Sequence, residues 1–296
     1  MRKICLLILT LFFIFSSYSQ IVTTPITNRT NGTLKKEYLE DAVIRCLYER
    51  KQVFTNNGNL DYSIDTLTLE LGKRYSLFYD ENKIYRDSLF SAFGNSVYPE
   101  LKYVHANTKT ESFLELRNQG GKYIEKSAAG ESARMYKDRK SQTIISIDYE
   151  GIMYAFKLTE KIPPQQWEIM NDTLTVMGYL CQKAVATFRG RNYIVWFTSE
   201  IPVNDGPWKL YGLPGLILKA ATEDSIFMFD AIGIEKLVNP VKITMDKDEY
   251  IQCNRKEMEI IHQKNKTSSR LLYFKDGNSY AGGRVEPWVF EPIELK

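Results

Sequence analysis

The sequence predicts an α+β protein, mainly β, built on one large, curved antiparallel meander sheet with peripheral helices. Three observations support this fold class. Apolar residues alternate along many segments of strand length, turn signals separate these segments at short intervals, and few stretches show helical spacing. Successive hairpins of this kind form antiparallel sheets, and a sheet covered on one face leaves a concave apolar groove.

The first predicted strands lie in the N-terminal third. Apolar residues alternate through Val43–Thr55 and Ile64–Leu71, and the Asn57-Gly58 dipeptide between them is a hairpin signal. Tyr75–Tyr79 is a further aromatic strand. Asn82–Phe93 then shifts to the spacing of a short helix.

The pattern weakens after this helix. Between Tyr98 and Lys140 we find one moderate apolar run, Ser112–Leu116, followed by a polar stretch rich in Lys, Ser, Ala and Gly. Segments without periodicity favour irregular structure. We therefore predict a variable insertion at about 81–140.

Regular strands return in the middle of the chain. They are expected at Ile144–Tyr149, Ile152–Leu158, Asp172–Met177, Cys181–Phe188 and Tyr193–Thr198, with turns at Glu150-Gly151, Gly178-Tyr179 and 189–192. Tyr193–Thr198 carries bulky residues on both faces, which is typical of an interior strand.

Two strands, a helix and an edge strand are expected after residue 215. The strands are Leu216–Ala221 and Ile226–Ala231. Asp246 followed by Glu249 predicts a helix N-terminus, and apolar residues recur at helical intervals toward Lys266. Leu271–Phe274 is predicted as an edge strand. Asp276-Gly277 turns into a Gly- and Pro-rich tail that contains Trp288 and Phe290.

The stretch Ile201–Ala220 is the most distinctive part of the chain. Its structural residues are Gly206, Pro207, Gly212, Pro214 and Gly215, which together predict a rigid connection with positive φ at Gly212 or Gly215. Alanine at either glycine should cost about 1–3 kcal/mol. Lys209 is expected at an exposed rim, where its replacement by alanine should cost under about 1 kcal/mol.

The same stretch supplies the candidate binding residues. They are Trp196, Trp208, Lys209, Tyr211 and Leu213. Lys209 lies between two aromatics, which permits a cation–π contact. Rigid loops with exposed aromatics are common docking surfaces. The alternative is a purely structural corner whose Trp and Leu residues close the end of the sheet.

The N-terminus predicts export. Arg2-Lys3, the apolar run Ile4–Phe15 and Ser17-Tyr18-Ser19 have the order of a secretory signal peptide at residues 1–19, followed by a single domain at 20–296. We expect a periplasmic or outer-membrane surface location and no membrane span in the mature chain. The formal net charge of +3 and the scattered basic residues argue against nucleic acid as a partner.

Catalytic and metal-binding patterns are lacking in the sequence. It has two histidines, His105 and His262, and no HExxH, paired CxxC, GxSxG or glycine-rich phosphate motif, so we expect no metal and no cofactor. Export leaves three cysteines, Cys46, Cys181 and Cys253, whose simplest interpretation is small buried residues. A hydrolase that uses Lys209 or acids near the loop, such as Asp205 and Asp224, is left open.

The loop also carries a family resemblance. GPWKLYGLPGLIL resembles the signature of the GLPGLI family, which comprises secreted, mostly uncharacterised proteins of Bacteroidetes-type bacteria. The likeness extends upstream through Met177–Pro202 and to the ending Glu291-Pro292-Ile293-Glu294-Leu295, which resembles the family's terminal Asn-Pro-Ile-Glu-Leu with Glu in place of Asn. The resemblance implies a link to outer-membrane receptors of the TonB-dependent type.

Three functional hypotheses follow from the sequence. The first is an exported binding protein that holds an apolar or peptide-like ligand in the groove of its sheet, with the loop at its mouth. Its shape would be like the half-open barrel of periplasmic lipoprotein carriers, an analogy of fold alone. The alternatives are a hydrolase of unknown class and an envelope scaffold that contacts only other proteins.

Overall fold

The structure is a computed structural model that describes residues 23–24, 35–56, 58–85, 103–104, 122–126, 130–150, 154–247, 249–275, 278–285 and 291–295. Several sequence-based expectations lie outside these residues. They are the signal peptide at 1–19, the apolar run Ser112–Leu116, His105, the turn at Asp276-Gly277, and the tail residues Trp288 and Phe290.

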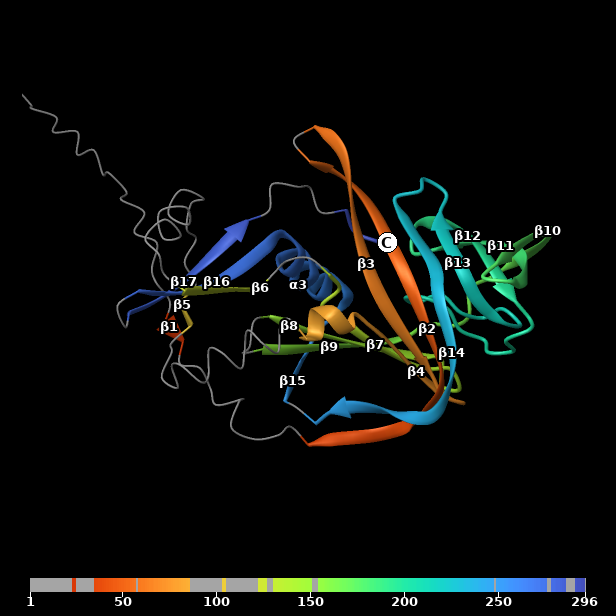
Figure 1. Cartoon of the computed structure of the whole chain (residues 1–296), viewed down its shortest axis with the longest axis horizontal. Coiled ribbons are helices and arrows are strands. Elements are labelled where there is room, and N and C mark those ends of the chain that lie inside the picture. Colours follow the sequence, from red (N-terminus) through yellow and green to blue (C-terminus); the bar gives the residue numbers. More distant parts are fainter. Residues whose placement is uncertain are drawn as a thin grey trace, which may run out of the picture.

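Twelve of the described strands form one large sheet, as Figure 1 shows, in the order β10-β11-β12-β13-β14-β2-β3-β4-β7-β8-β9-β15. In chain order they are β2 (Lys36–Asn56), β3 (Asn59–Leu71), β4 (Tyr75–Tyr79), β7 (Arg134–Asp138), β8 (Thr143–Glu150), β9 (Tyr154–Lys161), β10 (Glu168–Val176), β11 (Tyr179–Phe188), β12 (Arg191–Thr198), β13 (Leu216–Thr222), β14 (Phe227–Asp246) and β15 (Tyr250–Gln252). All neighbours are antiparallel except β15, which is parallel to β9. The predicted fold class, mainly β with a large antiparallel sheet, is confirmed.

Smaller elements surround this sheet. The strands β17 (Asn278–Val285), β16 (Ser268–Lys275) and β6 (Lys122–Lys126) form a second sheet, and β1 (Thr23–Thr24) pairs with β5 (Tyr103–Val104). The helix α3 (Arg255–Thr267) lies against β8 and β9. Among the described residues, no helix is long and apolar enough to cross a membrane.

The long strands β2, β3 and β14 bend and lie near the middle of the sheet (Figure 1). β2 pairs with β3 through a hairpin at Gly58, whose φ of 80° is readily adopted by glycine. Three register shifts interrupt the pairing of β2 with β14. Bulges of this kind bend a strand and increase its twist.

Bending brings distant strands around one core. Buried side chains of β2, β3, β4 and β7 belong to the same apolar cluster as those of β11, β12 and β13. Leu67, Leu69 and Leu71 alternate into this cluster from β3, as the period of two requires. The loop between β12 and β13 supplies Trp208 and Leu213 to the same core. The loop is therefore an interior element of the fold.

The structure corrects the predicted helix boundaries. Asp246 ends β14, and Tyr250 lies in β15 rather than in a helix. The N-cap of α3 is Asn254: the Glu257 backbone N–H donates to Asn254 Oδ1 (3.0 Å), and the Asn254 N–H donates to Glu257 (2.8 Å). This capping box lies two turns further along the chain than the predicted one. Of the predicted helix at Asn82–Phe93, the described residues 81–85 are helical.

One predicted strand and one predicted irregular segment differ from the structure. Leu271–Phe274 was expected at an edge, but it belongs to β16, the central strand of the three-stranded sheet. The predicted irregular insertion reached Lys140, whereas Arg134–Asp138 forms β7 inside the large sheet, between β4 and β8. Three of the five residues of β7 are charged, and Lys137 is buried through its ion pair with Asp205, so the sequence shows no apolar alternation.

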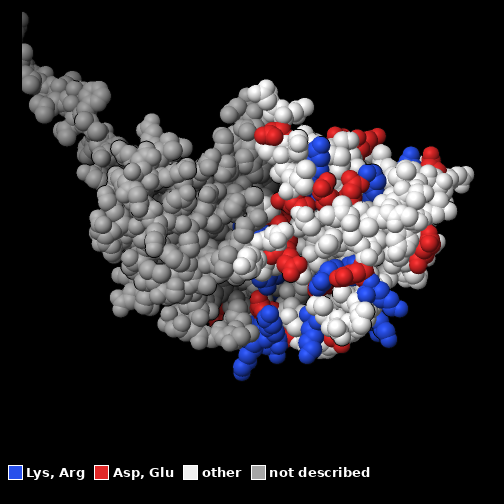
Figure 2. All heavy atoms as spheres, in the orientation of Figure 1, with Lys and Arg blue, Asp and Glu red and all other residues white. Residues whose placement is uncertain are grey.

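Charge is interspersed on the face shown in Figure 2, where acidic and basic side chains lie close together and basic ones are most frequent along the lower edge. Many of the charges in the described residues are paired across strands, as in Arg45 with Glu70 and Lys219 with Asp230. The pair of Lys219 with Asp230 is half-exposed, and such pairs contribute little to stability, typically about 0–1 kcal/mol each.

Candidate functional site

The loop between β12 and β13 is buried, not exposed. Trp208, Lys209, Tyr211 and Leu213 are each at most 4% exposed. The expectation of an exposed Lys209 at a rim is therefore wrong. The packing agrees with the alternative that the loop's Trp and Leu residues close one end of the sheet.

A buried acid fixes the loop to the neighbouring strands. Asp205 is fully buried and binds the ammonium of Lys137, the guanidinium of Arg139 at 2.7 Å and the hydroxyl of Ser76 at 2.6 Å. Burial by itself would raise the pKa of Asp205, but the two cations outweigh it and lower that pKa. Asp205 is therefore a structural anchor, and its oxygens are committed to this network.

The glycines of the loop are required by close approach and by backbone conformation. Gly212 has φ of 110°, and a Cβ there would lie 2.6 Å from Pro164 Cβ. A Cβ at Gly215 would overlap the carbonyl oxygen of Thr198. The prediction of positive φ at one of these two glycines is confirmed at Gly212. A side chain at either position would strain the loop.

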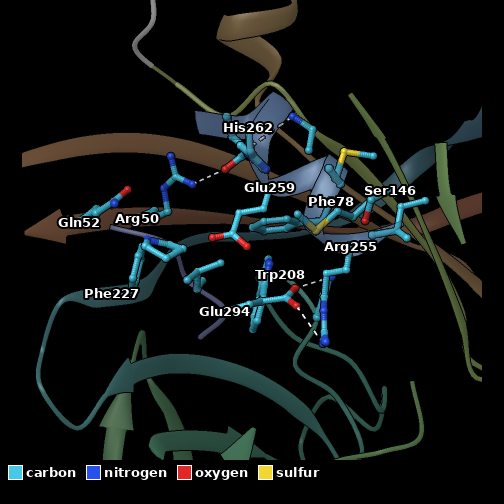
Figure 3. Close-up of a pocket in the computed structure, with 18 of the residues that line it drawn as sticks. Arg50, Gln52, Phe78, Ser146, Trp208, Phe227, Arg255, Glu259, His262 and Glu294 are labelled. Atoms are coloured by element: carbon cyan, nitrogen blue, oxygen red, sulfur yellow. Dashed lines mark hydrogen bonds and ion pairs between the residues drawn. The ribbon is translucent and has the colours of Figure 1, made fainter. Parts of the chain in front are cut away.

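A cavity of about 90 Å³ lies beneath α3, as Figure 3 shows. Its lining residues come from β2, β4, β7, β8, β9, the loop, β14, α3 and the C-terminal segment: Arg50, Gln52, Phe78, Glu131, Ala133, Met135, Ser146, Leu158, Trp208, Lys209, Phe227, Phe229, Arg255, Met258, Glu259, His262, Glu291, Pro292, Ile293 and Glu294. The volume holds several water molecules or one small ligand group.

One wall of the cavity is aromatic and apolar. Phe78 and Phe229 line the cavity and contact each other edge-on with centroids 6.4 Å apart, and Tyr48, which does not line it, contacts Phe78 in the same way at 6.4 Å. Trp208 stacks on Tyr193 at 6.1 Å between centroids. Such contacts hold the rings in fixed positions. The wall is therefore a preformed apolar surface.

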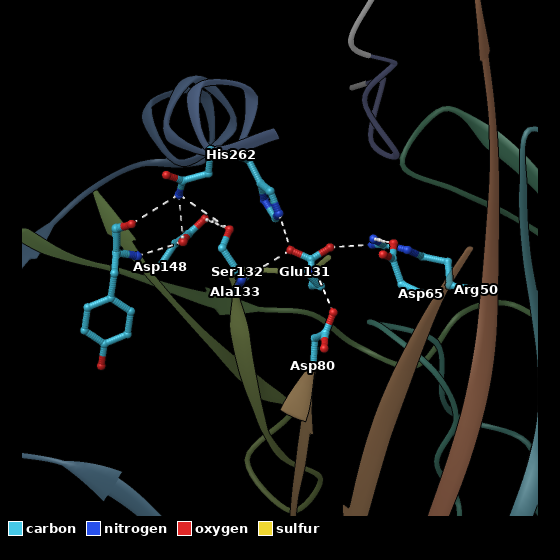
Figure 4. Close-up of polar contacts among 10 residues, drawn as sticks. Arg50, Asp65, Asp80, Glu131, Ser132, Ala133, Asp148 and His262 are labelled. Atoms are coloured by element: carbon cyan, nitrogen blue, oxygen red, sulfur yellow. Dashed lines mark hydrogen bonds and ion pairs between the residues drawn. The ribbon is translucent and has the colours of Figure 1, made fainter. Parts of the chain in front are cut away.

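A polar network crosses the cavity between β2 and α3 (Figure 4). Glu131 binds the Arg50 guanidinium at 2.5 Å through one oxygen and the His262 imidazole through the other. Arg50 also binds Asp65. Burial opposes the charge of Arg50, but Glu131 and Asp65 outweigh this effect and raise the arginine pKa. Glu131 thus links the helix to the central strands.

A second set of contacts holds the C-terminal end of α3. Asn265 Nδ2 donates to Asp148 Oδ1 at 3.0 Å, and the Ser132 hydroxyl donates to Asp148 Oδ2 at 3.1 Å. Burial raises the pKa of Asp148, an effect that His262 partly offsets. Met258 and Ile261 bury the apolar side of the helix. Together these contacts make α3 the cover of the cavity.

The C-terminal segment 291–295 forms the remaining wall. Arg191 on β12 donates to the carbonyl oxygens of Pro292 (2.8 Å) and Ile293 (3.2 Å) and to the Glu291 carboxylate (2.7 Å). The ammonium of Lys209 binds Glu294 at 2.5 Å and Glu160 at 2.7 Å. The loop between β12 and β13 and the C-terminal segment 291–295, which lie far apart in the sequence, therefore meet at one site.

Two of the predicted binding residues, Trp208 and Lys209, line the cavity. Tyr211 and Leu213 are buried in the core and do not line it, and Trp196 is a partly buried residue of β12 that does not line it either. The expected cation–π contact between Lys209 and Trp208 is present at 5.8 Å.

His262 and Glu131 were not among the predicted site residues. His262 lies far from the loop in sequence, and Glu131 falls within the predicted insertion at about 81–140. No local pattern indicates a pair separated by 131 positions. Asp224, the other acid considered, accepts hydrogen bonds within its own turn and binds Arg191 at 2.7 Å. Among the described residues, no group of three or more His, Cys, Asp or Glu is placed to hold a metal ion.

The fold and the cavity define a mainly β protein with a largely apolar cavity closed by a helix and a terminal segment. Residues 129–262, fewer than half of the chain, match the family model described as N-glycanase peptide, N-terminal domain. No curated protein matches the chain.

Two solved structures of PNGF-II, in different crystal forms, are similar to this chain at 13% sequence identity, with TM-scores of 0.47 and 0.45. Each alignment covers 80% of this chain and 35% of the PNGF-II chain, so the chain spans about a third of the length of PNGF-II. The comparisons do not bear on the GLPGLI resemblance, which stays a prediction.

Proposed function

We propose that this chain is an exported binding protein that holds an apolar or peptide-like ligand in the cavity beneath α3. The observation that carries the proposal is the composition of the cavity, whose lining combines a fixed aromatic wall with several charged groups, among them the buried Arg50, Glu131 and Lys209. Binding sites commonly combine a largely apolar lining with a few polar groups that orient the ligand.

One polar group in the wall has no partner among the described residues. The hydroxyl of Ser146 is buried and makes no hydrogen bond. An unpaired buried hydroxyl costs about 1–3 kcal/mol, so a ligand that bonds to it recovers part of this free energy. Ser146 therefore favours a ligand with a polar atom beside its apolar body.

The proposed location is the periplasm or the outer-membrane surface, as the N-terminal sequence predicts. The partner implied by the family resemblance, an outer-membrane receptor of the TonB-dependent type, would supply or receive the ligand. Both statements rest on the sequence.

The test is a titration of the purified chain with xenon, an uncharged apolar probe small enough for a cavity of about 90 Å³, followed by xenon NMR. We expect saturable binding that Ser146→Met abolishes by filling the cavity, whereas Ser146→Ala retains it. Because both variants change the same buried position, the difference reports occupation of the cavity. Absence of binding to the folded parent chain, or equal binding to both variants, contradicts the proposal.

A second candidate is processing of glycosylated peptides. The matched segment 129–262 contributes Glu131, Trp208, Lys209 and His262 to the cavity, and the family description names an N-glycanase. Incubation with a glycosylated asparagine peptide and mass spectrometry of the products separates the two. Release of the glycan, lost in Glu131→Gln, favours the enzyme; binding without release favours the binding protein.

A further inference from the structure

The C-terminal segment 291–295 is held in the way that a bound peptide is held. Three of its backbone carbonyls accept hydrogen bonds from side chains of the sheet, two from Arg191 and one from Gln52 Nε2, which donates to Glu291 O at 3.1 Å. The Leu295 N–H donates to the Arg189 carbonyl at 2.8 Å. Contacts with main-chain atoms do not depend on the side chains of the segment that makes them.

Side-chain contacts add selectivity for acidic residues. Glu291 binds Arg191, and Glu294 binds Lys209, while Ile293 between them packs against the apolar core. If the segment leaves, two carboxylates leave with it. Arg191 and Lys209, 3% and 4% exposed at the side chain, then lose part of their counter-charge. The vacated site therefore attracts negative charge.

The segment fits this site imperfectly. Glu294 Oε2 lies 3.7 Å from Arg189 Nε and 3.8 Å from Arg255 Nη1, which is beyond hydrogen-bond distance. All three atoms are buried and have no hydrogen-bond partner among the described residues. Buried polar atoms left unpaired are costly. A carboxylate placed a little nearer to both guanidinium groups would bind better than Glu294 does.

We propose that the cationic site formed by Arg191, Lys209, Arg189 and Arg255 recognises a short acidic peptide segment of a partner protein, and that residues 291–295 occupy it as a built-in competitor. This deepens the proposed function, on which it rests, by naming the ligand class. A partner segment binds when it displaces the built-in one, and displacement also removes one wall of the cavity, since Glu291–Glu294 line it.

The test uses the full chain and a labelled, end-capped peptide, Glu-Pro-Ile-Glu-Leu, with binding followed by fluorescence anisotropy. In the parent chain the built-in segment competes at an effective concentration on the order of millimolar, so the peptide binds weakly. We expect Glu291→Gln/Glu294→Gln, which weakens the built-in segment isosterically, to bind the peptide at least about tenfold more tightly. Glu235→Gln, which removes an exposed ion pair with Arg45, is the matched control and should bind like the parent.

A peptide with Gln at both Glu positions should bind neither chain. In the unmodified parent chain, excess acidic peptide should also speed hydrogen exchange of the Leu295 amide, because that amide leaves Arg189 when the segment is displaced. This second measurement holds even where the double variant fails to fold.

The outcomes separate the two proposals. If the folded double variant binds the acidic peptide no better than the parent, or the Leu295 amide does not respond, the peptide site is refuted. Binding of xenon in that case leaves the proposed function standing. Failure of both probes removes both proposals.

Discussion

Replacing Lys209 by alanine tests whether the signature loop is an interior element. The Lys209 side chain is 4% exposed, and its two partners, Glu160 and Glu294, are 12% and 14% exposed at the side chain. Removing one partner of a buried ion pair leaves charge without compensation and costs about 3–5 kcal/mol. Arg189 still contacts Glu160 at 2.8 Å, so we expect the low end, about 3 kcal/mol.

A loss of this size should lower the melting temperature of the chain by about 6–12 °C. The matched control is Lys219→Ala, which removes a half-exposed pair with Asp230 and should cost under about 1 kcal/mol. Differential scanning calorimetry of both variants and the parent decides the matter. If the melting temperatures of Lys209→Ala and Lys219→Ala both lie within about 2 °C of that of the parent, Lys209 is solvated and the loop is not an interior element.

Three further predictions concern the backbone, the buried acid and the thiols. Gly212→Ala should lower the free energy of unfolding in urea more than Gly178→Ala, because both glycines have positive φ but only a Cβ at position 212 would meet a close neighbour, Pro164. Equal losses of stability would show that the close approach to Pro164 does not matter. The pKa of Asp205 is lowered in the folded state, so its ion pairs stabilise the fold above about pH 4 and lose this contribution as the pH falls. The free energy of unfolding of Asp205→Asn should therefore fall less steeply with acid than that of the parent. An unchanged pH profile of stability would contradict this. Burial raises the pKa of Cys46 to about 12 and that of the half-buried Cys253 to about 11, so mass-mapped alkylation of the native chain should label Cys253, the more exposed thiol, before Cys46. Earlier labelling of Cys46 would contradict the packing described.

Much of the sheet could be predicted from local sequence. Alternation such as Leu67, Leu69 and Leu71 reports which side chains share a face, because the period of a strand is two. Tyr75–Tyr79 was predicted with the bounds of β4, and the hairpin at Gly58 has the positive φ that its sequence favours. These properties depend on neighbouring residues and need no knowledge of distant ones.

The error at α3 has a local cause. Asp246-Lys-Asp-Glu249 and Asn254-Arg-Lys-Glu257 both have the spacing of a capping box. Pairing of Tyr250–Gln252 with β9 decided between them, because a residue that joins a sheet is unavailable for a helix. The sequence contained the correct signal, but only tertiary pairing selected it.

The sequence by itself determined the strand pattern and the rigid Gly-Pro connection, since turn chemistry and side-chain periodicity act over a few residues. Tertiary structure alone decided that Lys209 is buried, that His262 meets Glu131, and that residues 291–295 close the cavity. Each of these contacts joins positions tens to hundreds of residues apart. These contacts form because the bent sheet folds over its core to bury apolar area. This burial involves the whole chain and cannot be predicted from a short window of sequence.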